Sequence, residues 1–65
     1  MAKISLRAAR ISAGYSAEKA AKQVGVSRFT LLKYEKGDTV PRWDVFETLC
    51  KLYGVSVTDI FLPKE

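Results

Sequence analysis

SAEKAAKQVGVSRFTLLKYEKG, at residues 16–37, decides the fold because it predicts two short helices joined by a tight turn. A serine precedes each helical run, and a serine hydroxyl is a preferred acceptor for the free N–H groups at a helix start. Gly25 is the residue type that most readily adopts the left-handed conformation at a helix end. We therefore expect helices at residues 17–24 and 28–36.

The helical period gives each of these helices a buried face and an exposed face. The face expected to pack inward comprises Ala20, Ala21 and Val24 of the first helix and Leu31, Tyr34 and Glu35 of the second. The side chains left on the outer surface of the second helix are Arg28, Phe29, Thr30, Leu32, Lys33 and Lys36. Three of them are positively charged, so this face suits a polyanion such as DNA.

Caps and stops elsewhere in the chain predict three further helices, at residues 6–13, 43–53 and 57–62. Gly14 and Gly54 follow the first two of them. The connecting segments are short, and no stretch shows the alternation of a long strand. We predict an all-α fold, with five short helices in one compact domain over the whole 65-residue chain.

The composition favours a basic, non-catalytic domain. Eleven Lys and Arg against seven Asp and Glu give a net charge of +4, which favours a polyanionic partner. Cys50 is the only cysteine and there is no histidine, so we expect no internal disulfide, metal site, cofactor or enzymatic nucleophile–base pair. No stretch predicts a signal peptide or membrane span, so we expect a cytoplasmic protein with no membrane contact.

The joint spacing of these signals resembles the lambdoid phage repressor and Cro-type helix-turn-helix proteins, often called the Xre family. The residues that carry the resemblance are LRAARISAGYSAEKAAKQVGVSRFTLLKYEKG at 6–37, Pro41, and FETLCKLYGVSVTDIF at 46–61. The resemblance implies a compact five-helix domain of the phage repressor type. Its recognition helix, residues 28–36, would enter the DNA major groove, while helix 17–24 would lie across the backbone.

The resemblance also implies a role for each exposed residue of the motif. Base contacts are expected from Arg28 to guanine O6 and N7, from Phe29 to a thymine methyl, and from Lys33 to guanine or a phosphate. Contacts to the DNA backbone are expected from Ser16, Ser27, Thr30, Lys36, Thr39 and Arg42. The family commonly has glutamine where this chain has Ala17, so one side-chain contact to phosphate is absent.

Arg10 interrupts the apolar stripe of the first predicted helix, and two interpretations are open. An arginine in such a position ordinarily extends its charged head to solvent along its aliphatic stem. The resemblance instead implies a buried ion pair between Arg10 and Glu35, which would orient the recognition helix.

The C-terminal end carries more apolar residues than one helix face requires. The resemblance implies dimerisation through this end, which would place two recognition helices about 34 Å apart. The expected dimer contacts are Val57, Ile60, Phe61 and Leu62. Such a homodimer would use this end or the flank of the helix at 43–53, or would form only on the operator.

These features predict a small transcriptional regulator of a bacterium, phage or mobile element that binds double-stranded DNA sequence-specifically, without a small-molecule ligand. The alternative is an antitoxin-like protein-interaction module with autoregulatory or lost DNA binding. The apolar Phe29 and Leu32 on an otherwise polar face motivate this alternative, which requires a protein partner. Leu32 would either pack beside the helix at 43–53 or contact that partner.

Overall fold

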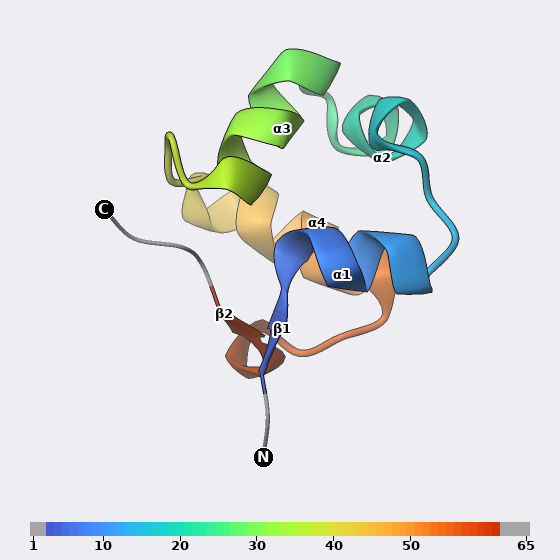
Figure 1. Cartoon of the computed structure of the whole chain (residues 1–65), viewed down its shortest axis with the longest axis vertical. Helices are drawn as coiled ribbons and strands as arrows, with labels where there is room; N and C mark the ends of the chain where they lie inside the picture. The colour runs from blue at the N-terminus through green and yellow to red at the C-terminus, as the bar shows by residue number, and fades with distance from the viewer. Residues whose placement is uncertain (1–2, 62–65) are drawn as a thin grey trace.

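The structure is a computed structural model that describes residues 3–61. In chain order its elements are β1 Ile4–Ser5, α1 Leu6–Ser12, α2 Ala17–Val24, α3 Arg28–Lys36, α4 Trp43–Tyr53, the 3-10 helix η1 Val57–Asp59 and β2 Ile60–Phe61. The α-helices pack together, and the two short strands lie beside each other at the opposite end from α2 and the start of α3 (Figure 1). Within residues 3–61, no helix combines the length and apolar character needed to cross a membrane.

Local capping groups set the helix bounds. The side-chain oxygens of Ser5, Ser16 and Ser27 each accept a hydrogen bond of 3.1 Å from the backbone N–H three residues later. Gly25 and Gly37 end α2 and α3 in the left-handed conformation, with φ of 80° and 88°. The bounds of α2, α3 and α4 coincide with those expected from these signals, while α1 ends one residue earlier.

The predicted helix at residues 57–62 is wrong. Of its described residues, only Val57–Asp59 is helical, as one 3-10 turn with a capping box opened by Ser56, and Leu62 lies outside the described residues. The chain then extends as β2, which pairs in parallel with β1 and places Ile60 opposite Ile4. The backbone of β2 is therefore paired with the other end of the described chain instead of continuing a helical turn. The fold is mostly helical, with four α-helices in the described part rather than five.

One apolar cluster joins the four α-helices and β2. Leu31 of α3 and Leu49 of α4 have no exposed surface, and burial of each such side chain is worth about 1.5 to 3 kcal/mol. The small buried side chains Ala20 and Ala21 let α2 approach α3 closely. Because Leu31 and Tyr34 point into the cluster, the opposite side of α3 is held toward solvent.

Candidate nucleic-acid interface

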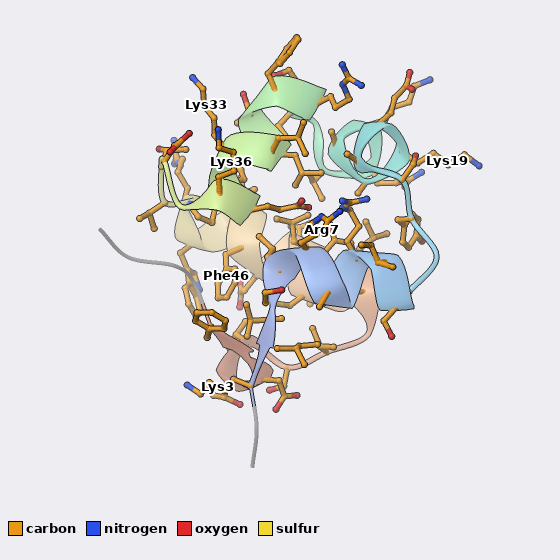
Figure 2. All side chains as sticks on the ribbon, in the orientation of Figure 1. Lys3, Arg7, Lys19, Lys33, Lys36 and Phe46 are labelled. Carbon is orange, nitrogen blue, oxygen red and sulfur yellow. The ribbon has the colours of Figure 1, made fainter. Side chains whose placement is uncertain are left out.

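The exposed side of α3 carries the three side chains expected to contact bases. Arg28, Phe29 and Lys33 are all exposed, and Phe29 has 69% of its surface accessible. With 3.6 residues per turn, these residues and Lys36 fall within an arc of about 140° on the helix surface. Lys33 projects away from the body of the molecule (Figure 2). The structure therefore brings the candidate base contacts together on one solvent-facing side of a rigid helix.

Arg28 and Phe29 contact each other at the first turn of α3. The Arg28 guanidinium carbon, Cζ, lies 5.5 Å from the centroid of the Phe29 ring. This distance is within the roughly 6 Å range of a cation–π interaction, which holds the guanidinium over the ring face. Neither Arg28 nor Lys33 forms a salt bridge with another described residue. Their charges remain available to a ligand.

Ser27 and Thr30 share a hydrogen bond beside this turn. The Ser27 Oγ accepts from the Thr30 backbone N–H and lies 2.9 Å from the Thr30 Oγ1. The two hydroxyls have two protons between them, and their mutual bond uses one. One hydroxyl proton is thus left to donate to a phosphate oxygen. The predicted backbone contacts Ser27 and Thr30 therefore form one unit with a single free donor.

Three further backbone-contact candidates lie at the end of α3 and in the loop after it: Lys36, Thr39 and Arg42, all exposed. The Lys36 Nζ lies 3.5 Å from an Asp38 carboxylate oxygen, and the Arg42 Nε lies 3.6 Å from an Asp44 carboxylate oxygen. Such exposed pairs are worth little, about 0 to 1 kcal/mol. Both cations can leave their acidic neighbours for a phosphate at small cost.

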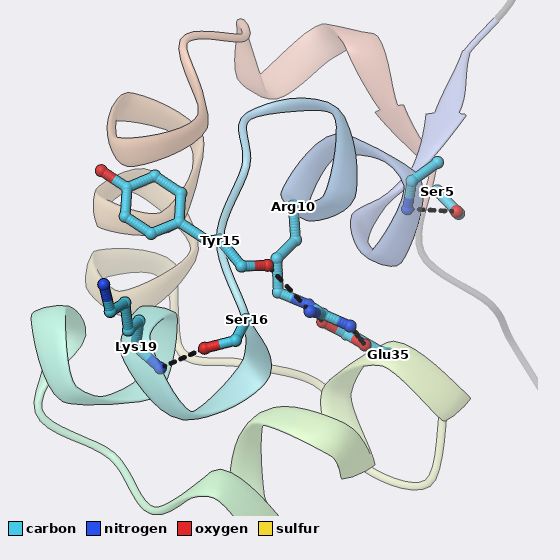
Figure 3. Close-up of polar contacts among 7 residues, drawn as sticks. Ser5, Arg10, Tyr15, Ser16, Lys19 and Glu35 are labelled. Atoms are coloured by element: carbon cyan, nitrogen blue, oxygen red, sulfur yellow. Dashed lines mark hydrogen bonds and ion pairs between the residues drawn. The ribbon is translucent and has the colours of Figure 1, made fainter.

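The start of α2 is arranged differently from the start of α3. The Ser16 hydroxyl accepts from the Lys19 backbone N–H, so it caps the helix (Figure 3). The side chain of Ala17 is half-buried and offers no polar group, and Glu18 adds a negative charge to this first turn. The exposed cation nearest in sequence is Lys19. A phosphate at this end would be bound mainly by Ser16, free backbone N–H groups and Lys19.

Arg10 and Glu35 form a buried ion pair that ties α1 to the end of α3. The Arg10 Nε lies 2.7 Å from the Glu35 Oε2, and the two side chains are only 9% and 3% exposed. A second guanidinium nitrogen donates to Glu35 Oε1 at 3.3 Å, and the third donates to the Tyr15 backbone oxygen at 3.0 Å (Figure 3). Arg10 therefore points inward to the two partners rather than outward to solvent.

Two tyrosines lie near this ion pair. The rings of Tyr15 and Tyr53 lie 6.1 Å apart, centroid to centroid. The Tyr53 hydroxyl is buried without a hydrogen-bond partner among the described residues. Burial, followed by the nearby Glu35 carboxylate, raises the pKa of Tyr53 to about 12. The apolar stripe of α4 predicts the burial of Tyr53, but no local pattern predicts what its hydroxyl meets.

The residues expected at a dimer interface are divided by the structure. Ile60 is 5% exposed and belongs to the core, and Val57 is half-buried against it. Phe61 is 50% exposed, and Leu62 lies outside the described residues. Leu32 on α3 is half-buried. Of the described candidates, Phe61 offers the most apolar surface to a partner.

Comparison with known proteins identifies the family. Residues 4–60 match the family model described as a helix-turn-helix domain. An uncharacterized HTH-type transcriptional regulator of Bacillus subtilis (strain 168), YgzD, is 40% identical over 52 residues, which are 80% of this chain and 79% of the relative. The cryptic phage CTXphi transcriptional repressor RstR of Vibrio cholerae is 33% identical over 60 residues, 92% of this chain and 54% of RstR.

A third relative is MJ0272 of Methanocaldococcus jannaschii, an uncharacterized HTH-type transcriptional regulator. It is 38% identical over 48 residues, which are 74% of this chain and 73% of the relative. No solved structure gives a significant match. The family match spans β1, the four α-helices and η1, so it includes the exposed side of α3. The chain therefore belongs to the helix-turn-helix domain family, and its similarity to a phage repressor agrees with the repressor and Cro type that its residues resemble.

Proposed function

We propose that this protein is a transcriptional regulator that binds double-stranded DNA sequence-specifically, with α3 in the major groove. The observation that carries the proposal is the exposed side of α3, where Arg28, Phe29 and Lys33 lie on one face while Leu31 and Tyr34 fix the opposite face in the core. Arginine and lysine recognise guanine edges in the major groove, and an apolar side chain recognises the thymine methyl. The named relatives are transcriptional regulators or a repressor.

The charge distribution supports an anionic partner at this motif. Residues 16–37 contain five Lys or Arg and two Glu. The carboxylate of Glu35 is buried and paired with Arg10, so it does not oppose a ligand on the outer side of α3. Phosphate contacts from the Ser27 and Thr30 pair and from Lys36 would position α3 without reading sequence. Neutralised phosphates would make the affinity fall steeply with salt.

Three further contacts would hold the DNA backbone on either side of α3. Ser16 lies at the start of α2, while Thr39 and Arg42 lie in the loop between α3 and α4. The weak Arg42–Asp44 pair leaves that guanidinium available to a phosphate. Two copies bound to neighbouring half-sites would place their recognition helices about 34 Å apart. Phe61 is the described side chain with which such a homodimer would be built.

The antitoxin-like alternative has less support. A protein-interaction surface on α3 requires both apolar side chains, Phe29 and Leu32, to be exposed on its outer side. Leu32 is half-buried, and the proposed contact with a thymine methyl would account for the exposed Phe29. None of the three relatives is named as an antitoxin. The DNA-binding function is therefore the one we retain.

Selection of bound sequences from a random pool of duplex DNA tests the proposal. We expect one recovered motif, which is palindromic if two copies bind together. The Arg28→Ala/Lys33→Ala variant should fail to select that motif. Lys51→Ala is the matched control, because it removes an exposed positive charge from α4 outside the helix-turn-helix. Recovery of no motif by the wild-type protein, or of the same motif by the double variant, would overturn the proposal.

A further inference from the structure

The contact between Arg28 and Phe29 points to a particular base step. We propose that these two residues act as one unit that reads a pyrimidine carrying a C5 methyl group followed by guanine. The inference rests on the proposed function, since it assumes that α3 lies in the major groove. It adds the identity of the two neighbouring bases that are read. It also predicts that the affinity for DNA depends on the C5 methyl group of one of them.

The Arg28 and Phe29 side chains extend from the N-terminal turn of α3. Arg28 and Phe29 are the first two residues of the helix, and helical Cα–Cβ bonds tilt toward the N-terminus. This end of α3 lies at the periphery of the molecule, away from the two strands (Figure 1). The neighbouring Ser27 and Thr30 hydroxyls form a hydrogen bond with each other. Arg28 and Phe29 are therefore the long side chains that the first turn presents to a ligand.

The cation–π contact orients the guanidinium for a base edge. With its Cζ 5.5 Å from the ring centroid, the guanidinium is restricted to one side of Phe29. Its N–H donors form a rigid planar fork that matches the O6 and N7 acceptors of guanine. A guanidinium held over a ring loses less freedom when it binds than a free one does. The free protein thus already holds the planar Arg28 guanidinium and the apolar Phe29 ring side by side.

The spacing of the pair matches neighbouring bases. The 5.5 Å separation lies between one and two base-pair steps of about 3.4 Å. The C5 methyl group of a pyrimidine lies on its major-groove edge. In the proposed complex this pyrimidine lies directly before the guanine that Arg28 binds, with its C5 position against Phe29. A methyl group there would cover part of a ring that is 69% exposed in the free protein.

Thymine and 5-methylcytosine carry this methyl group, whereas cytosine and deoxyuridine have only hydrogen at C5. The unit should therefore accept thymine–guanine and 5-methylcytosine–guanine steps and discriminate against unmethylated cytosine–guanine. Phe29 forms no hydrogen bond, so it cannot distinguish the two methylated pyrimidines by their exocyclic groups. The property read at this position is the methyl group itself.

Binding titrations with modified duplexes test the inference. The probes are synthetic duplexes of the selected motif with thymine, deoxyuridine, cytosine or 5-methylcytosine before the guanine that Arg28 contacts. For the wild-type protein, thymine to deoxyuridine should weaken binding about 4-fold, the factor expected for one buried methyl group. Cytosine to 5-methylcytosine should strengthen it by a similar factor. Phe29→Ala should bind the members of each pair equally.

Ile11→Ala is the matched control, since it removes an exposed apolar side chain from α1 rather than from α3. It should retain the wild-type response to the methyl group. Circular dichroism should show a native fold for both variants, because both side chains are more than half exposed. A motif without a pyrimidine–guanine step, or equal wild-type affinities within each pair, would overturn the inference and leave the proposed function standing. Absence of any selected motif would overturn both.

Discussion

The Nε of Arg10 lies 2.7 Å from the Oε2 of Glu35, with both side chains almost completely buried, so one ion pair joins α1 to the last turn of α3. Removing two charges from water is costly, and the attraction between them repays this only with good geometry and additional hydrogen bonds. Here Arg10 makes hydrogen bonds to both carboxylate oxygens and to the Tyr15 carbonyl. The pair fixes where α3 ends relative to α1, and hence how its outer side is presented.

Breaking this pair on one side should be much worse than replacing both members. Arg10→Met leaves the Glu35 carboxylate buried without its partner, so we expect a loss of about 3 to 5 kcal/mol in the free energy of unfolding. Arg10→Met/Glu35→Leu leaves no buried charge and should recover most of that loss. Urea denaturation of the three proteins measures the difference. Equal, small losses in both variants would show that the pair is not a buried, coupled unit.

Tyr53→Phe should stabilise the protein at neutral pH. The buried Tyr53 hydroxyl has no partner among the described residues, so the native state has lost hydrogen bonds that the unfolded state makes with water. Removing the hydroxyl should raise the free energy of unfolding by about 1 kcal/mol. Urea denaturation at pH 7 checks this. A loss of more than about 1 kcal/mol would instead indicate that the hydroxyl is hydrogen-bonded, for example to a buried water.

The same variant should be less sensitive to alkali. The pKa of Tyr53 is raised from 10.0 to about 12, so between these values the unfolded chain releases a proton that the native protein keeps. Stability from this group is complete below pH 10 and is lost as the pH rises toward 12, by roughly 1 to 3 kcal/mol. Denaturation at pH 8 and pH 11 should show a smaller decrease for Tyr53→Phe than for wild type. Parallel decreases would contradict the shift.

Arg28→Ala and Lys36→Ala should impair DNA binding in different ways. Arg28→Ala should cost about 1 to 3 kcal/mol on the selected motif and relax the preference for one base, because its donors read a base edge. Lys36→Ala should weaken all sequences alike and reduce the slope of affinity against salt by about one ion, as expected for a phosphate contact. Titrations against the motif, single-base variants and random duplex at several salt concentrations measure both effects. An unchanged base preference for Arg28→Ala would refute its role.

Substitutions at two neighbouring residues of β2 should affect different properties, folding stability at Ile60 and self-association at Phe61. Ile60→Ala removes a core side chain and should lower the free energy of unfolding by about 2 to 4 kcal/mol. Phe61→Ala removes a half-exposed ring and should cost about 1 kcal/mol or less. If Phe61 contributes to a dimer, analytical ultracentrifugation with operator DNA should show fewer two-copy complexes for this variant. Unchanged assembly of Phe61→Ala would exclude Phe61 from the interface.

The bounds of the central helices were predictable because their signals are local. Ser16 and Ser27 cap α2 and α3 through backbone groups three residues away, and Gly25, Gly37 and Gly54 end α2, α3 and α4 in the left-handed conformation. Each signal acts within one helical turn, so it can be read without knowing what packs nearby. The apolar period likewise predicts which sides of α3 and α4 are buried.

The C-terminal segment was not predictable in the same way. Ile60 and Phe61 take their conformation from pairing with Ile4 and Ser5, which lie at the other end of the described chain. Two-residue strands are too short to show an alternating pattern. A capping residue at Ser56 or Thr58 and the apolar Ile60 and Phe61 therefore indicated a helix where a long-range contact imposes an extended chain.

The sequence by itself determined a basic helix-turn-helix and the bounds of its two helices. Helix caps, glycine stops and helical periodicity depend on residues that are close together in the sequence. The tertiary structure alone decided what required side chains from distant segments to meet. The apolar stripe of α1 left two interpretations of Arg10 open, and the packing of α1 against α3 decides for the pair with Glu35 that the family resemblance implied. The burial of the Tyr53 hydroxyl without a partner among the described residues was not predicted from the sequence. Both arrangements bring together groups from segments that are far apart in the sequence, so the fold decides them rather than any local pattern.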